Sequence, residues 1–209
     1  MPSKTLVLLL LSLWLSATPV SANATAEATI AVLGDSLTAG YGLERRDAFP
    51  AQLERALRQS GWSVTVLNAG VSGDTTAGGL ARLDWLLADR PQAVIVALGA
   101  NDALRGLPPE QSFNNLDAIL ERLRAAGVRV LLAGMLAPRN LGDDYVNRFD
   151  RTYPELAARH QVALYPFFLA GVATEPALNQ ADGIHPNAAG VARIVEQILP
   201  DVIQLLEMR

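Results

Sequence analysis

Short apolar runs alternate with amphipathic segments along this chain, and this alternation restricts its fold more than any other pattern. The apolar runs cover residues 30–33, 64–69, 93–98, 128–133 and 162–165, and those at 30–33 and 93–98 are continuous. Strands that are buried on both faces have this pattern, whereas half-exposed strands alternate apolar and polar residues. Amphipathic segments separate the runs, so the sequence predicts an α/β domain of three layers, with a five-stranded parallel sheet between two layers of helices.

Turn residues, prolines and caps mark where the predicted helices begin and end. The helices cover residues 49–60, 76–88, a segment that ends near residue 127, residues 145–160, and a final segment that Asn187 caps. Pro154 predicts either a kink or a new first turn within the fourth helix. We expect a loop at residues 37–47 and a turn at residues 99–102, because both segments are polar and contain glycine.

The first 24 residues have the composition of a secretory signal peptide. Lys4 precedes an apolar run over residues 6–15, and the small residues after it offer cleavage sites near residues 22, 24 and 26. The run is shorter than the roughly 20 residues of a transmembrane helix, which disfavours the alternative of an uncleaved membrane anchor. We predict a periplasmic or secreted protein with a signal peptide at residues 1–24, one domain at residues 25–209, and no membrane span after cleavage.

Composition excludes several kinds of site. The 209 residues contain no cysteine, which rules out disulfides, lipid attachment through an N-terminal cysteine, and thiolate zinc sites. Only two histidines are present and they lie far apart in the sequence, which argues against a His-rich metal site. The net charge of −4, with both signs interspersed, argues against a nucleic-acid partner. We expect a monomer that acts on small molecules.

Polar and glycine residues follow the first three predicted strands, where each strand ends. Ser36 comes two residues after the glycine that ends the first run, Gly73 follows the second strand, and Asn101 follows the third. The carboxyl ends of parallel strands meet at one edge of the sheet, which is where open α/β sheets bind their ligands. We therefore expect these three residues to lie close together. Considered alone, Ser36 could equally cap a helix or form a turn.

The last loop before the final helix supplies the partners that a serine nucleophile requires. A serine hydroxyl needs a base, and His185 is the histidine in a loop at this edge of the sheet. His160 ends a helix, where a cation is favourable, so we interpret it as structural. Asp182 lies three residues before His185 and can turn back to orient the imidazole. A simple turn residue is the alternative for Asp182.

The tetrahedral intermediate of acyl transfer needs hydrogen-bond donors directed at its oxyanion. The Asn101 side chain and the backbone N–H groups of Ser36 and Gly73 are the candidates. The alternatives are a cap or turn role for Asn101 and a tight turn at Gly73. Three carboxylates near these strand ends are interpreted as local turn or hydrogen-bonding groups: Asp35, Asp74 and Asp102.

Four blocks of this sequence resemble the four motif blocks of the SGNH (GDSL) hydrolases. They are Gly34-Asp35-Ser36-Leu37, Ser72-Gly73-Asp74-Thr75, Gly99-Ala100-Asn101-Asp102 and Asp182-Gly183-Ile184-His185-Pro186. Their order and spacing are most similar to the periplasmic subgroup of multifunctional thioesterases, lysophospholipases and arylesterases. The resemblance implies Ser36 as nucleophile, His185 as base, Asp182 as its partner, and an oxyanion hole of Ser36, Gly73 and Asn101. It also implies a flavodoxin-like sheet of strand order 2-1-3-4-5 and no cofactor.

We therefore predict an exported serine esterase that hydrolyses acyl esters and thioesters through an acyl-enzyme intermediate. Apolar loop residues are candidates for holding the acyl chain, with ordinary core packing as the alternative: Leu104, Leu107, Met135, Leu136, Phe167 and Phe168. A related alternative is an acetylesterase that acts on polysaccharide. A non-catalytic flavodoxin-like binding protein is less favoured, because no phosphate-binding glycine motif follows the first strand. The α/β-hydrolase fold is also disfavoured, since Thr38 occupies the second glycine position of its G-x-S-x-G motif.

Overall fold

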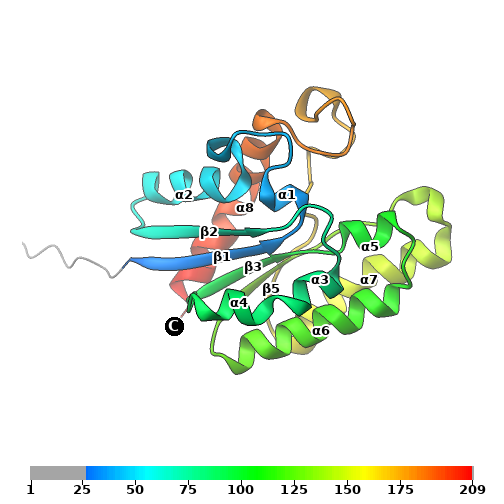
Figure 1. Cartoon of the computed structure of the whole chain (residues 1–209), viewed down its shortest axis with the longest axis horizontal. Helices are drawn as coiled ribbons and strands as arrows, with labels where there is room; N and C mark the ends of the chain where they lie inside the picture. The colour runs from blue at the N-terminus through cyan, green and yellow to red at the C-terminus, as the bar shows by residue number, and fades with distance from the viewer. Residues whose placement is uncertain (1–26, 209) are drawn as a thin grey trace, which may run out of the picture.

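A single parallel sheet organises the part of the chain that the computed structural model describes, residues 27–208. Its five strands have the order β2-β1-β3-β4-β5, as predicted (Figure 1). They are β1 (Ala28–Gly34), β2 (Val64–Gly70), β3 (Ala93–Ala97), β4 (Arg129–Ala133) and β5 (Ala163–Tyr165). The predicted signal peptide at residues 1–24 lies outside the described residues and stays a prediction.

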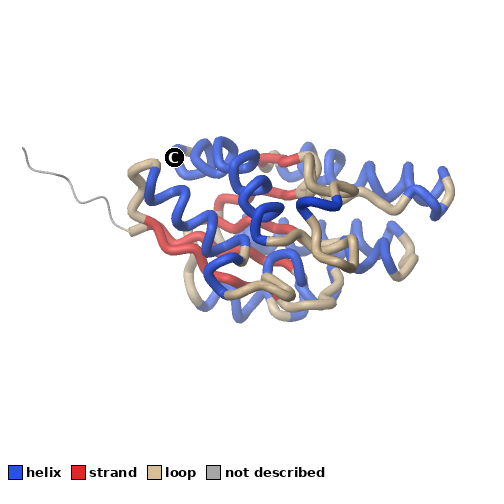
Figure 2. Tube along the Cα trace, turned by 90° about the horizontal axis from the view of Figure 1, so that it is seen from above, coloured by secondary structure: helices blue, strands red, loops and turns tan. Residues whose placement is uncertain are grey.

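Helices cover both faces of the sheet and complete the predicted three layers (Figure 1, Figure 2). One layer contains α2 (Phe49–Gln59) and α8 (Ala188–Glu207), which pack against each other. The other contains α3 (Thr76–Ala81), α4 (Leu83–Ala88), α6 (Pro109–Ala125) and α7 (Asp143–His160). Short 3₁₀ helices occupy Arg45–Asp47, Arg139–Leu141 and Pro176–Leu178. Within residues 27–208, no helix combines the length and apolarity needed to cross a bilayer.

The central strands are buried because a layer of helices lies over each of their faces. All five residues of β3 are buried, as are the last five residues of β1. Burial on both faces explains why these strands are continuous apolar runs. The sheet therefore forms a rigid base, and the loops at its carboxyl edge project from that base.

Two one-turn helices stand where the sequence predicted a loop and a turn. They are α1 (Ser36–Ala39), directly after β1, and α5 (Ala100–Leu104), directly after β3. The Asp35 carboxylate caps α1 by accepting the Leu37 N–H at 3.0 Å. Gly99, with φ +115°, makes the turn into α5. Helices of four or five residues are too short to show helical periodicity, which explains why the sequence pattern missed them.

The predicted helix at residues 76–88 is two helices, because Arg82 leaves the helical conformation with φ −106° and ψ 10°. Its guanidinium instead donates to the carbonyl oxygens of Gly34 at 2.8 Å and Ala69 at 2.7 Å. The predicted start of α7 at residue 145 is two residues late, and the helix continues through Pro154. Asn187 caps α8 as predicted, since its side-chain oxygen accepts two backbone N–H groups.

Gly99→Ala should destabilise the protein. A Cβ atom at residue 99 would lie 2.1 Å from the Tyr153 hydroxyl oxygen, and φ is +115°. Overpacking of this kind costs about 1–3 kcal/mol, measurable by urea unfolding. The loss should be smaller in a Tyr153→Phe background, where the nearest ring atom is 3.4 Å away. Equal losses in both backgrounds would show that the hydroxyl contact is not the cause.

Candidate active site

Three side chains from opposite ends of the sequence form one hydrogen-bonded chain at the carboxyl edge of the sheet. The Ser36 hydroxyl lies 2.9 Å from Nε2 of His185, although the two residues are 149 positions apart. Nδ1 of His185 lies 2.6 Å from Oδ2 of Asp182. Ser36 is the first residue of α1, and the other two lie in the loop before α8. The structure thus brings together the three residues that the sequence selected.

Asp182 is both a turn residue and the partner of the imidazole. Its Oδ1 atom accepts the backbone N–H groups of Ile184 and His185, each at 3.0 Å. The backbone bond from His185 lowers the pKa of Asp182 most. The bond from Ile184 and the imidazole contact lower it further, to about 2. The carboxylate is therefore ionised at neutral pH, and its own loop fixes its direction. The two interpretations of this residue are compatible.

Backbone and side-chain donors lie just after β1, β2 and β3: Ser36 in α1, Gly73 in the loop after β2, and Asn101 in α5. Within residues 27–208, the N–H groups of Ser36 and Gly73 donate to no other group. For Ser36 this follows from its place in the first turn of a helix, whose N–H groups have no partner within the helix. The Asn101 amide nitrogen donates to the Asp74 carbonyl at 2.9 Å and to Oδ2 of Asp35 at 3.3 Å.

Asp35 has a larger role than the local one expected from its sequence. Its side chain is fully buried and connects two loops, because one oxygen caps α1 and the other accepts from Asn101. Desolvation raises the pKa of Asp35 to about 6, opposed by the Leu37 N–H and by the nearby His185. A carboxylate placed directly after a buried strand is the sequence feature that indicates such a buried charge.

Asp74 and Asp102 are hydrogen-bonding groups, as expected. Oδ2 of Asp74 accepts from Nε of Arg82 at 2.7 Å. The buried Asp102 accepts the Thr76 N–H at 2.8 Å, the Thr76 hydroxyl at 2.6 Å and the Ser112 hydroxyl at 3.1 Å. It therefore joins α5 to α3 and α6, so its contacts extend well beyond its own turn.

The second histidine has a structural position. Nε2 of His160 lies 2.6 Å from Oδ1 of Asp117, and this pair joins α7 to α6. Asp117 also pairs with Arg159 at 3.2 Å. The described part of the chain contains no group of three or more His, Cys, Asp or Glu side chains arranged to bind a metal ion.

Comparison with known proteins identifies the family. The sequence model of the GDSL-like lipase/acylhydrolase family matches residues 32–193. The chain belongs to the SGNH (GDSL) hydrolases. Both the predicted family and the predicted class of enzyme, an ester hydrolase, are therefore confirmed.

The similarity extends over most of this SGNH hydrolase. Esterase TesA of Pseudomonas aeruginosa is 44% identical over 179 residues, which cover 85% of this chain and 89% of the relative. Thioesterase 1/protease 1/lysophospholipase L1 of Escherichia coli is 43% identical over 166 residues, 79% of this chain and 78% of the relative. A crystal structure of TesA matches with a TM-score of 0.81 and 44% identity, over 85% of this chain and 99% of that chain.

The apolar loop candidates of this hydrolase divide into two groups by exposure. Leu104 and Leu136 are 55% and 39% exposed, at the end of α5 and after β4. Met135 and Phe168 are buried in the core, where Phe168 packs edge-on against Phe49 at 5.0 Å between ring centroids. The remaining candidates, Leu107 and Phe167, are half-buried. Core packing thus accounts for Met135 and Phe168.

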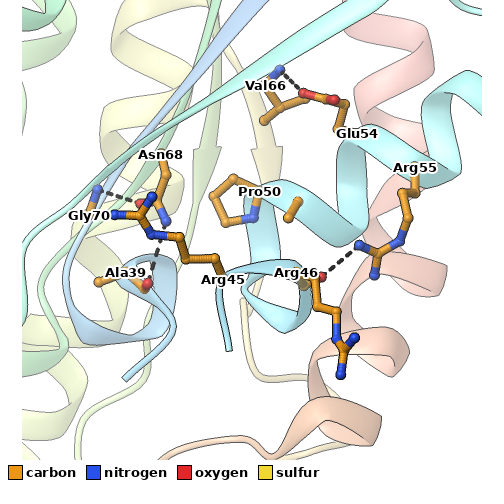
Figure 3. A pocket seen from close by; sticks show the side chains of 10 residues that line it. Ala39, Arg45, Arg46, Pro50, Glu54, Arg55, Val66, Asn68 and Gly70 are labelled. Carbon is orange, nitrogen blue, oxygen red and sulfur yellow. Dashed lines mark hydrogen bonds between the residues drawn. The ribbon is translucent and has the colours of Figure 1, made fainter. Parts of the chain in front are cut away.

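A separate cleft of about 700 Å³ lies beside the outer strand β2 and does not include Ser36, Asp182 or His185. Figure 3 shows the Arg45 side chain extending toward Asn68, whereas Arg46 and Arg55 lie on the other side of Pro50. Arg55 donates to the Arg46 carbonyl at 2.6 Å, and Arg46 pairs with Glu44 at 3.0 Å. The three guanidinium groups do not converge on one point.

Asp35→Asn should raise the free energy of unfolding at pH 7 more than at pH 4. Burial raises the pKa of this carboxyl to about 6. Between about pH 4 and pH 6 the unfolded chain therefore loses this proton while the folded chain keeps it, and the free energy of unfolding falls as the pH rises. Above pH 6 the penalty is constant at about 3 kcal/mol, using 1.36 kcal/mol per pKa unit. The neutral amide avoids this penalty.

Urea unfolding at the two pH values measures the effect, with the exposed Asp89→Asn as control. The gain should be largest at pH 7 for Asp35→Asn and absent at both values for Asp89→Asn. Equal gains at pH 4 and pH 7 would contradict the assignment. Ester-hydrolase activity should fall in Asp35→Asn, because the new amide nitrogen would face the Asn101 amide nitrogen in place of an acceptor.

Proposed function

We propose that this chain is an exported serine esterase that hydrolyses acyl esters and thioesters through an acyl-enzyme intermediate. The observation that carries the proposal is the hydrogen-bonded chain from Ser36 through His185 to Asp182. The names of its relatives, an esterase and a thioesterase/lysophospholipase, support the range of substrates. The predicted signal peptide supports export from the cytoplasm.

Acylation begins when the Ser36 hydroxyl oxygen attacks the carbonyl carbon of the substrate. Nε2 of His185 accepts the hydroxyl proton, and Asp182 stabilises the imidazolium that forms. The tetrahedral intermediate then collapses, and the imidazolium returns the proton to the departing alcohol or thiol. The acyl group remains bonded to Ser36. A water molecule, deprotonated by His185, attacks this ester and releases the carboxylic acid.

The oxyanion of each tetrahedral intermediate receives hydrogen bonds from Ser36 N–H, Gly73 N–H and the Asn101 amide. The two backbone groups have no acceptor in the described chain, so they are available without breaking another bond. The Asn101 amide must exchange one of its two bonds, and the longer one, 3.3 Å to Asp35, is the weaker. Donors of this kind contribute about 2.7–4 kcal/mol each to transition-state stabilisation.

Ser36→Ala should abolish hydrolysis of p-nitrophenyl esters and of a long-chain acyl-CoA by the mature chain. Loss of a triad nucleophile lowers kcat by about a millionfold. Ser72→Ala removes an exposed hydroxyl from the loop that carries Gly73 and serves as the control, with activity near wild type. If the Ser36→Ala variant were as active as wild type, Ser36 would not be the nucleophile and the proposal would be wrong. Turnover confined to acetyl esters would instead favour the acetylesterase alternative.

Leu104→Ala and Leu136→Ala should lower kcat/KM for octanoyl and longer esters and leave acetyl esters unchanged. Both side chains are exposed at the active edge of the sheet, and each CH₂ group of an acyl chain that they cover contributes about 0.8 kcal/mol. Trp85→Ala is the control, because Trp85 is exposed on α4. An unchanged ratio of long-chain to acetyl activity in both leucine variants would exclude them from the acyl site.

A further inference from the structure

The imidazole of His185 contacts a third side chain that the mechanism above does not use. The ring centroid of Tyr41 lies 4.6 Å from that of His185, with the two planes inclined by 36°. Both nitrogens of the His185 ring already contact Asp182 and Ser36 at the ring edge. Tyr41 therefore packs against a face of this ring. Tyr41 remains 54% exposed, and its hydroxyl makes no hydrogen bond within residues 27–208. The ring of Tyr41, and not its hydroxyl, makes the contact.

The backbone of Tyr41 connects the two loops that carry the reacting groups. Its N–H donates to the Ser36 carbonyl at 3.1 Å, at the end of the one-turn helix α1. Its carbonyl accepts from Nε2 of Gln180 at 2.7 Å, across 139 residues of sequence. Tyr41 is therefore held between the nucleophile and the loop of the base.

Gln180 holds that second loop closed. The same Nε2 atom also donates to the Pro186 carbonyl at 3.0 Å. The backbone N–H of Gln180 donates to the His185 carbonyl at 2.7 Å, and its own carbonyl accepts the Gly183 N–H at 3.0 Å. One residue thus contacts both ends of the segment that contains Asp182 and His185, and ties this segment to Tyr41.

The Gln180 side chain lies where a side chain at residue 42 would begin, and residue 42 is a glycine. A Cβ atom at residue 42 would lie 2.2 Å from Oε1 of Gln180, and φ is +72° at this position. The positive φ favours glycine here, and the absence of a Cβ also leaves room for the end of the Gln180 side chain. The loop after α1 and the Gln180 side chain fit each other closely, which supports a built connection between the two loops.

We propose that Tyr41 and Gln180 form a clamp that positions the His185 imidazole against Ser36. This inference rests on the proposed function, in which His185 is the base. The 2.9 Å contact between Ser36 and His185 joins helix α1 to the loop before α8, and a displacement of about 1 Å can lower a rate about 100-fold. The ring of Tyr41 also presents its face to the imidazolium, an attraction that a non-aromatic side chain lacks.

Steady-state kinetics with p-nitrophenyl acetate test the clamp in the mature chain. Tyr41→Phe keeps the aromatic ring and should retain kcat within about twofold. Tyr41→Leu keeps an apolar side chain without a ring, and its kcat should fall about tenfold. Gln180→Ala should lower kcat about 10- to 100-fold, and Gln180→Glu should not rescue it because a carboxylate would face two carbonyl oxygens. KM should change less than threefold throughout. Val71→Ala, which removes an exposed apolar side chain from the neighbouring loop, is the control.

Nuclear magnetic resonance of the imidazoles separates positioning from general destabilisation. The chain has only two histidines, so His160→Gln assigns both sets of signals, and His160 reports on the rest of the fold. In Gln180→Ala, the Nδ1–H of His185 should exchange faster with water while His160 is unchanged. Equal changes at both histidines, or wild-type kcat in Tyr41→Leu and Gln180→Ala, would overturn the clamp. Activity in Ser36→Ala would instead overturn the proposed function itself.

Discussion

The guanidinium of Arg82 connects the ends of two strands to the loop that follows the second of them. It donates to the carbonyls of Gly34 at the end of β1 and of Ala69 in β2, and it pairs with Asp74. The Gly34 carbonyl also accepts the Val71 N–H at 3.1 Å, so Arg82 supplies a second donor to the end of β1. Because Ser36 lies just beyond Gly34 and Gly73 just before Asp74, Arg82 fixes the spacing between the two loops.

The same residue interrupts the helix between α3 and α4. A continuous helix over residues 76–88 would satisfy its own backbone, but the bend at Arg82 directs the side chain toward the strand ends. The pair of Arg82 and Asp74 is largely shielded from solvent. Removing either partner of this partly shielded pair leaves the other charge without its ion-pair partner, which destabilises the fold. The helix is interrupted at Arg82, and its side chain contacts the ends of β1 and β2 instead.

The sequence predicted the strands and the residues at their ends, because burial on both faces leaves a continuous apolar pattern. Ser36, Asp182 and His185 were found from chemistry and from the shared sheet edge, without knowledge of the contacts. The bonds of Asp35 to Asn101 and of Gln180 to Tyr41 were not found, because no reaction step requires these groups to meet in the way that a nucleophile requires a base. Periodicity reports which face of an element is buried, and it contains no information on which distant side chain lies opposite.

Two carboxylates, one exposed and one buried, interact with the His185 imidazole. Asp182 is partly exposed and keeps a low pKa through backbone N–H groups, whereas burial raises the pKa of Asp35 to about 6. Pairs of titratable groups whose surroundings separate their pKa values are typical of acid–base sites. His185 opposes the upward shift of the Asp35 pKa, so a charge on either group favours the charge on the other. Above pH 6 both carboxylates are ionised, and in the proposed mechanism both favour the positive charge that His185 carries after it accepts the Ser36 proton.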